Sequence, residues 1–229
     1  SEETIGRQVR YQWLNEIAQS EGYDYISVAH HKDDQAESIL AHIIRGSGLN
    51  GLTGMSVVQS EYAIPVVRPL LDVTKEDLLA YIGTKHISYC VDSTNEDVRY
   101  QRNRIRHRII PELEAVNPAV VDAIVRLGSS VNEDVMVISD LTSRTFDKLV
   151  SIGDDEVRIS RRALRQEPLA IQRRLWQRLV STIDSDLTLT SAHQEQLLDI
   201  VNTGEKKTFT IKSIKVIAQC DTIKVYCKH

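Results

Sequence analysis

The feature that most constrains the fold is a short apolar run at residues 25–29, which leads directly into a helical pattern. The run reads Tyr-Ile-Ser-Val-Ala and suits a buried strand. A capped amphipathic helix that stops before Gly22 is predicted in front of it, and a second helix is predicted from about residue 33 to residue 45, with Gly46 as its C-cap. Strands that alternate with helices in this way are typical of a parallel sheet. The N-terminal half therefore predicts an α/β fold.

Further elements of the same kind follow, but few of them are strands. Residues 65–69 are expected to be extended, and Thr74 with Asp77 predicts the N-cap of a third helix. Residues 87–91 predict another strand, with its turn at residues 92–95. Two or three strands are too few for a complete sheet of this class. We therefore expect that earlier strands of the sheet have been cut away from this chain.

The pattern changes after residue 117, and we predict two domains, residues 1–117 and residues 118–229. A long helical pattern opens the second domain, Pro168 is well placed as the first residue of another helix, and Ser191 predicts the cap of a further one. Residues 207–228 alternate Lys with Ile and Val, as a β-hairpin does. The second domain is therefore expected to be smaller, helical or α+β.

The composition is that of an ordinary globular protein, with 41% hydrophobic and 26% charged residues. No apolar run approaches the roughly 18 residues of a membrane span, so we expect no membrane association. Three cysteines are too few and too scattered for a disulfide framework or a CxxC metal site, which favours the reducing cytoplasm: Cys90, Cys220 and Cys227. The net charge of −4 gives no global indication of nucleic-acid binding.

A helical wheel divides the helix after His30-His31 into an aliphatic face and a polar face. The aliphatic face holds Ala36, Ile39, Leu40, Ile43 and Ile44. The polar face holds Asp34, Glu37, Ser38 and Arg45. A solvated polar face is the ordinary interpretation of such a pattern.

Three details favour a binding site instead. His30 and His31 follow the strand at residues 25–29, at the sheet edge where parallel α/β proteins bind ligands. Asp33 and Asp34 lie in the first turn of the helix, where the helix dipole favours their ionised form. Adjacent acids beside imidazoles suit a cation, either a metal–nucleotide or an ammonium group. Zinc is less favoured, because adjacent histidines on a strand point to opposite faces.

Arginines are concentrated in one segment of this acidic protein. Five lie within ten residues that contain no acid: Arg99, Arg102, Arg104, Arg106 and Arg108. Guanidinium forks suit phosphate, and the five cannot share one helix face, so some are expected to bind phosphate and others to be structural. A second, dispersed set is interpreted mainly as structural: Arg161, Arg162, Arg165, Arg173, Arg174 and Arg178.

The glycine-rich stretch at residues 45–55 reads Arg-Gly-Ser-Gly-Leu-Asn-Gly-Leu-Thr-Gly-Met. It is not a Walker loop, because it lacks the Gly-Lys-Ser/Thr ending. We expect residues 46–60 to form a loop, and the regular Leu and Met residues indicate that it packs against the protein.

Taken in order, six segments resemble a known family. They read His-His-x-Asp-Asp-Gln-Ala-Glu-Ser, Arg-Gly-Ser-Gly-Leu-x-Gly-Leu-x-Gly-Met, Arg-Pro-Leu-Leu, Asp-Ser-Thr-Asn, Tyr-x-Arg-Asn-Arg-Ile-Arg, and Pro followed by Asn-Pro. The series resembles the tRNA(Ile)-lysidine synthetases of the PP-loop ATP pyrophosphatase superfamily and covers about residues 1–118. Ser38 stands where the family commonly has Thr. The resemblance implies a truncated adenine-nucleotide-hydrolase-like parallel sheet followed by a tRNA-binding domain.

The resemblance also implies a reaction, catalysed by a ligase that forms a C–N bond. ATP, with Mg²⁺ expected, adenylates the C2 oxygen of the wobble cytidine in the CAU anticodon of tRNA(Ile) and releases pyrophosphate. The ε-amino group of free lysine then attacks C2, and AMP leaves. The product, lysidine, changes codon reading from AUG to AUA.

The residues above are assigned to this chemistry as follows. Asp34, with His30 beside it, is expected to meet the lysine ammonium group, and Arg102 to stabilise the anionic adenylate. Substrate binding is assigned to a further set, with no metal ligand among them: Asp33, Glu37, Ser38, Arg45, Arg104 and Arg106. The oligomeric state is not specified, and a homodimer stays open.

One departure from the family is serious. The phosphate loop Ser-Gly-Gly-x-Asp-Ser is absent from the sequence. Either the chain is a fragment of a longer enzyme, which we favour, or it is a degenerate member. Residues 1–229 alone are then expected not to form lysidine from ATP, lysine and tRNA.

Two rival functions remain. A related PP-loop enzyme that thiolates tRNA would need catalytic cysteines near the site, and the three cysteines lack the usual spacing. A non-catalytic tRNA-binding fragment fits the chain but leaves the acidic helix unexplained.

Overall fold

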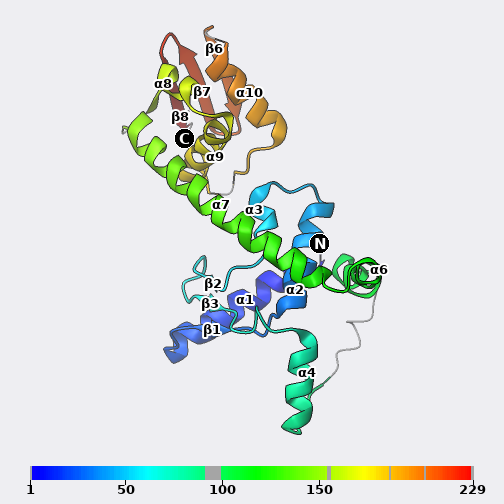
Figure 1. Cartoon of the computed structure of the whole chain (residues 1–229). Helices are drawn as coiled ribbons and strands as arrows, with labels where there is room; N and C mark the ends of the chain where they lie inside the picture. Colours follow the sequence, from blue (N-terminus) through cyan, green and yellow to red (C-terminus); the bar gives the residue numbers. More distant parts are fainter. Residues whose placement is uncertain (1, 91–98, 154–155, 186, 204, 228–229) are drawn as a thin grey trace. The chain divides into compact units, whose positions relative to one another are not determined.

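The computed structural model describes residues 2–90, 99–153, 156–185, 187–203 and 205–227. The chain divides into two compact units, Ser1–Glu133 and Asp134–His229, and the division falls inside the long helix α7 (Val120–Leu149) (Figure 1). The domain boundary expected at residue 117 stays a prediction. The predicted turn at residues 92–95 lies outside the described residues.

The first unit contains a small sheet with one parallel pair. Strand β1 (Ile26–Ser27) pairs in parallel with β3 (Val66–Val67), and β2 (Val58–Gln59) pairs antiparallel with β3. The strand order is β1-β3-β2. The predicted α/β class with a parallel sheet is therefore confirmed. The strand expected at residues 87–91 is wrong for residues 87–90, which have no regular secondary structure.

Helices precede, follow and separate the strands of this sheet along the chain. They are α1 (Glu2–Glu21), α2 (Lys32–Ile44), α3 (Leu49–Leu52) and α4 (Lys75–Thr84). The Thr74 side chain accepts a hydrogen bond from the Asp77 N–H at 3.1 Å, which confirms the predicted N-cap of α4. Gly46 ends α2 with a φ of +72°, a conformation that costs glycine little. The loop expected at residues 46–60 is interrupted by α3 and β2.

Figure 1 labels α6 (Ile110–Val116) at the end of a helical segment that begins with α5 (Gln101–Arg104). Between them, residues 105–109 form a π-helical turn in which the Ile110 N–H donates to the Ile105 carbonyl. Pro111 explains this wider turn, because it has no N–H and its ring crowds the carbonyl one turn before it.

The second unit is built around an antiparallel sheet. Its strands are β4 (Val150–Ile152), β5 (Val157–Ser160), β6 (Lys207–Ile211), β7 (Ile214–Gln219) and β8 (Thr222–Cys227), in the order β4-β5-β8-β7-β6. Its helices are α8 (Arg161–Gln166), α9 (Leu169–Ile183) and α10 (Ser191–Asn202). The hairpin expected in residues 207–228 is present as β7 and β8, and β6 extends it to three strands.

The core of this second unit joins the sheet to α9 and α10 (Figure 1). Trp176 and Leu179 of α9 are buried with Leu197 of α10. Burial of such side chains stabilises a unit by about 1.5–3 kcal/mol each. The N-cap of α10 is Thr190 rather than the predicted Ser191, and its hydroxyl accepts from the His193 N–H at 3.3 Å.

Candidate active site

The site begins where the parallel strands end. The chain leaves β1 through His30, and it leaves β3 through Arg68, whose side chain is only 2% exposed. The Arg68 guanidinium donates to the Ser56 carbonyl at 2.8 Å, to the Gln59 amide oxygen at 2.6 Å and to His30 Nδ1 at 3.3 Å. Arg68 therefore fixes the His30 ring at the carboxyl edge of the parallel pair, where ligands bind in this class of sheet.

Next to this edge, two arginines and two carboxylates form an ion-pair cluster. Asp34 and Glu37 come from α2, and Arg102 and Arg106 come from α5 and the π-helical turn. Arg102 donates to Asp34 at 2.8 Å and to Glu37 at 2.8 Å. Arg106 donates to Glu37 at 2.6 and 3.0 Å and to Asp34 at 2.9 Å. We call these four residues the α2–α5 cluster.

The two carboxylates of this cluster are buried. Glu37 is 1% exposed and Asp34 is 6% exposed, so each carboxylate depends on the guanidinium groups for the hydrogen bonds that water would have supplied. Burial alone would lower the pKa of Arg106, but the hydrogen bond and charge of Glu37 outweigh it and raise the pKa above its ordinary value. Two guanidinium groups thus face two carboxyl groups, so the cluster carries no formal net charge.

Two further residues fix the start of α2. The His31 N–H donates to Asp34 Oδ2 at 3.0 Å, and the His31 ring lies 3.3 Å from Asp33. Asp33 also accepts from the Lys75 N–H at 2.9 Å, which joins α2 to α4. The interaction with His31, helped by Lys75 and opposed by burial, lowers the pKa of Asp33 to about 2. Asp33 therefore links α2 to α4 and is ionised at neutral pH.

These contacts show that the polar face of α2 is not simply solvated. Asp34 and Glu37 are buried beneath the arginines, whereas Ile43 and Ile44, expected on the packed face, are 48% and 53% exposed. The predicted aliphatic face holds for Ala36 and Ile39, which are fully buried. Arg102 and Arg106 lie 65 residues or more from the acids that they bind, so a wheel of one helix could not reveal the pairing.

The remaining predicted site residues differ in their exposure. Ser38 is partly buried, and Arg45 and Arg104 are exposed. His30 contacts Arg68, and His31 contacts Asp34. Arg68 is the residue that sequence reasoning missed as a site residue. Its signal was a lone arginine inside an otherwise apolar extended stretch.

A cavity of about 490 Å³ adjoins the cluster and the β1 edge. Arg102 and His30 line it together with Val28 and Ala29 of the same edge. From α1, Arg10 and Tyr11 complete the polar part of the lining. A substrate in this cavity would meet one arginine of the cluster directly.

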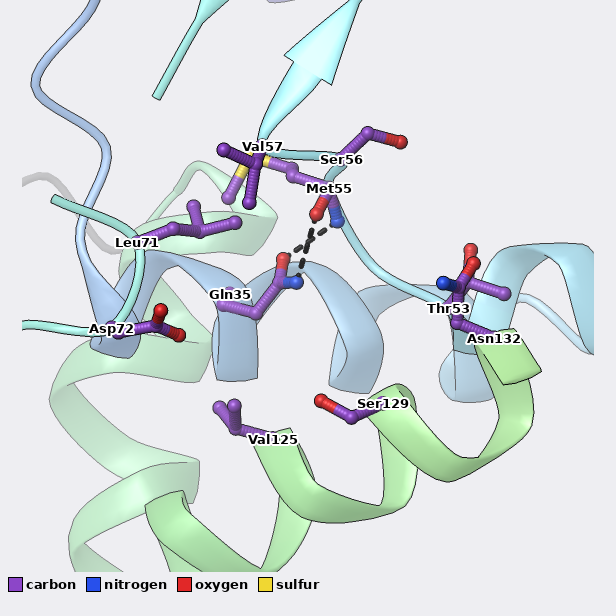
Figure 2. Close-up of a pocket in the computed structure, with 10 residues that line it drawn as sticks. All are labelled: Gln35, Thr53, Met55, Ser56, Val57, Leu71, Asp72, Val125, Ser129 and Asn132. Carbon is purple, nitrogen blue, oxygen red and sulfur yellow. Dashed lines mark hydrogen bonds between the residues drawn. The ribbon is translucent and has the colours of Figure 1, made fainter. Parts of the chain in front are cut away.

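Figure 2 shows a second cavity in the same unit, of about 340 Å³, next to the glycine-rich stretch. Gln35 closes one side, because its amide donates to the Met55 carbonyl at 2.9 Å and accepts from the Met55 N–H at 2.6 Å. Gly54 has a φ of +70°, and a Cβ there would lie 2.6 Å from the Gln35 amide oxygen. The stretch is therefore packed onto α2, as the sequence predicts.

Within the described ranges, no three His, Cys, Asp or Glu side chains are grouped so as to hold a metal ion. In the same ranges, every helix is too short or too polar to cross a membrane.

Comparison with known proteins shows the class of protein to which the first unit belongs. Residues 1–113 match the family model of the PP-loop domain, so this part of the chain belongs to the PP-loop proteins. Within that class, the chain is similar to the tRNA(Ile)-lysidine synthases, which confirms the resemblance expected from the motifs.

Two relatives show the extent of the match. The chain is 40% identical over 124 residues to the tRNA(Ile)-lysidine synthase of Porphyromonas gingivalis (strain ATCC BAA-308 / W83). The matched region covers 54% of this chain and 27% of that protein. The chain is 30% identical over 228 residues to the synthase of Caldanaerobacter subterraneus subsp. tengcongensis, and this match covers 99% of this chain and 47% of that protein. The chain thus spans less than half the length of these curated relatives.

Among solved structures, the chain is similar to the U34-tRNA thiolase NcsA from Methanococcus maripaludis. The TM-score is 0.45 and the identity 20%, over 57% of this chain and 43% of that chain. This likeness is too distant to bear on function.

Proposed function

We propose that the protein ligates lysine to C2 of the wobble cytidine in tRNA(Ile) with a CAU anticodon, at the expense of ATP, which gives AMP and pyrophosphate. The observation that carries the proposal is the α2–α5 cluster, which lies beside a cavity at the carboxyl edge of the parallel strands. The names of the relatives support the substrate class and do not favour thiolation or a purely non-catalytic role.

The chemistry has two requirements that the cluster can meet. Adenylation of the C2 oxygen creates negative charge on phosphate oxygens, which a guanidinium group stabilises. The attacking lysine arrives as an ammonium ion, which needs a carboxylate to hold it and to accept a proton before attack. Arg102 and Asp34 are assigned to these two tasks.

The geometry suggests how Arg102 and lysine share one carboxylate. Arg102 has 34% of its side chain exposed, against 22% for Arg106, and it alone of the two lines the cavity. Rotation of Arg102 toward the adenylate would vacate its positions at Asp34 and Glu37. The ε-ammonium group of lysine would then replace one cation by another, so the buried carboxylates stay neutralised throughout.

His30 has a different task from Asp34 in this scheme. Its Nδ1 accepts from Arg68, so the neutral ring carries its proton on Nε2. A ring held in this tautomer donates a hydrogen bond more readily than it accepts a proton. We therefore assign His30 to an oxygen that gains negative charge and not to deprotonation of lysine.

ATP with Mg²⁺ is the expected cosubstrate. Residues 1–229 do not contain the phosphate loop of the family. The cytidine must leave its stack to reach the cavity. Reaction in the cytoplasm, expected from the cysteines, stays a prediction.

The test compares wild type with Asp34→Asn in protein expressed from the complete gene. Incorporation of labelled lysine into tRNA(Ile) should fall at least 100-fold, while the Kd for tRNA changes less than about twofold, because the lost charge faces lysine and not phosphate. Arg126→Gln, exposed and in the same unit, is the matched control and should retain incorporation. Circular dichroism of both variants checks the fold. A collapse of tRNA affinity in folded Asp34→Asn would contradict the assignment.

A further inference from the structure

A second arginine cluster lies in the other unit, around a cavity of about 430 Å³. The lining residues are Arg161, Arg162, Arg165, Gln166, Cys220 and Asp221. We propose that this cavity binds a phosphate group of the RNA backbone. The proposal rests on the proposed function, which supplies a tRNA, and it names a contact that is separate from the reaction.

Arg161 gives the cavity a fixed charge. Its side chain is 2% exposed, and its guanidinium donates to the carbonyl of Ile200 at 2.5 Å and to that of Glu205 at 2.9 Å. A longer bond of 3.4 Å reaches the carbonyl of Cys220. Arg161 therefore joins α8 to the end of α10 and to the β7–β8 turn.

These partners solvate the guanidinium but do not neutralise it. Across the described residues, Arg161 has no carboxylate within ion-pair distance, and its Nε has no hydrogen-bond partner. A buried cation without a counter-ion is costly, and an anion that binds nearby offsets that cost. The positive charge is thus available to a ligand.

Two more arginines stand at the same cavity. Arg165 is oriented by the Val201 carbonyl, to which its Nε and Nη2 donate at 3.1 and 3.0 Å. Arg162 is exposed, and no packing role in the structure explains it. Among the described residues that line the cavity, Asp221 is the one acid, so three guanidinium groups and one carboxylate give a formal charge of +2. Forked donors around such a charge match the oxygens of a phosphate group.

The charge of the whole unit favours RNA as the source of that phosphate. Residues 134–229 contain 15 Lys and Arg against 13 Asp and Glu, whereas residues 1–133 contain 13 against 19. The basic unit attracts a polyanion that the acidic unit repels, and screening keeps each effect local, within about 10 Å. Arg161 makes the contacts of a structural arginine, whereas the proposal assigns the exposed Arg162 to phosphate.

The experiment uses protein from the complete gene and measures the Kd for tRNA(Ile) over a range of salt concentrations. The variant is Arg162→Gln with Arg165→Gln, which leaves Arg161 and its carbonyl contacts in place. The control is Arg144→Gln with Arg173→Gln, which removes the same charge from exposed positions of the same unit outside the cavity.

We expect the cavity variant to bind tRNA about tenfold more weakly, with a slope of log K against log salt that is smaller by about 1, as for one lost phosphate contact. The control should change affinity less than threefold. Equal losses in the two variants, or an unchanged affinity in the cavity variant, would overturn the proposal.

Titration with inorganic phosphate separates the two sources of the ligand. Thermal stabilisation by phosphate that the cavity variant lacks, together with unchanged tRNA affinity, would indicate a small-anion site and would overturn the RNA assignment. The proposed function is tested separately, because Asp34→Asn abolishes ligation without weakening tRNA, whereas the cavity variant weakens tRNA and keeps ligation at saturating tRNA. If the protein fails to ligate lysine but the cavity variant still binds tRNA more weakly than the control does, the proposed function fails and the proposed phosphate contact is supported.

Discussion

The two arginine clusters of this protein use the same side chain in opposite ways. Arg102 and Arg106 are held by the carboxylates of Asp34 and Glu37, so their charge is cancelled within the protein. Arg161 is held by carbonyl oxygens, so its position is fixed but its charge is not cancelled. The first arrangement can exchange one cation for another, and the second can attract an anion.

The partner of an arginine therefore indicates its use better than its sequence context does. Both clusters lie in short arginine-rich segments that begin a helix, and the two segments are similar in composition. The difference arises from the element packed against each helix, an acidic helix in one case and a helix end with a strand turn in the other.

We expect the largest loss in the free energy of unfolding from a substitution of Glu37. Glu37→Gln leaves two guanidinium groups with one carboxylate in a buried position, which should lower the free energy of unfolding by about 3–5 kcal/mol. Urea denaturation measures it, with Arg104→Gln as the exposed control at below about 0.5 kcal/mol. A loss below about 1 kcal/mol at Glu37 would show that the carboxylate is not a required counter-ion.

The carbonyl-held cluster should be less sensitive. Arg161→Lys keeps the charge but cannot reach three carbonyls with one planar fork, so the free energy of unfolding should fall by about 2 kcal/mol. Thermal denaturation of the second unit provides the measurement. If this conservative change cost as much as Glu37→Gln, the distinction between cancelled and uncancelled charge would lose its energetic basis.

The smallest effect concerns Asp33 and depends on pH. Its pKa is lowered from 3.8 to about 2, so its contribution is present above about pH 4 and is lost as the pH falls through 2. Asp33→Asn should cost about 1 kcal/mol at pH 6, after allowance for solvent screening, and progressively less toward pH 2. Unfolding curves at several pH values test this, and a constant difference across the range would contradict it.

Local structure was predictable where a residue has a fixed chemical role. Thr74 and Gly46 mark helix ends because a hydroxyl caps a free N–H and glycine adopts a positive φ. The α/β class followed from the order of the elements.

Longer-range features were not predictable from one sequence. The pairing of Glu37 with Arg102 crosses 65 residues, and the burial of Arg68 depends on contacts with β2 and the segment before it. Pro111 signals an irregular helix, but only the structure shows that the wider turn carries Arg106, which meets the same carboxylates as Arg102.

Nucleoside mass spectrometry of tRNA(Ile) tests whether Asp34 and its arginines serve lysine ligation. After incubation with ATP, lysine and protein from the complete gene, digestion should release lysidine in place of the wobble cytidine. The product should require both ATP and lysine and should be absent with Asp34→Asn. Lysidine formed at the wild-type rate by folded Asp34→Asn, or a sulfur-containing nucleoside in its place, would contradict the account.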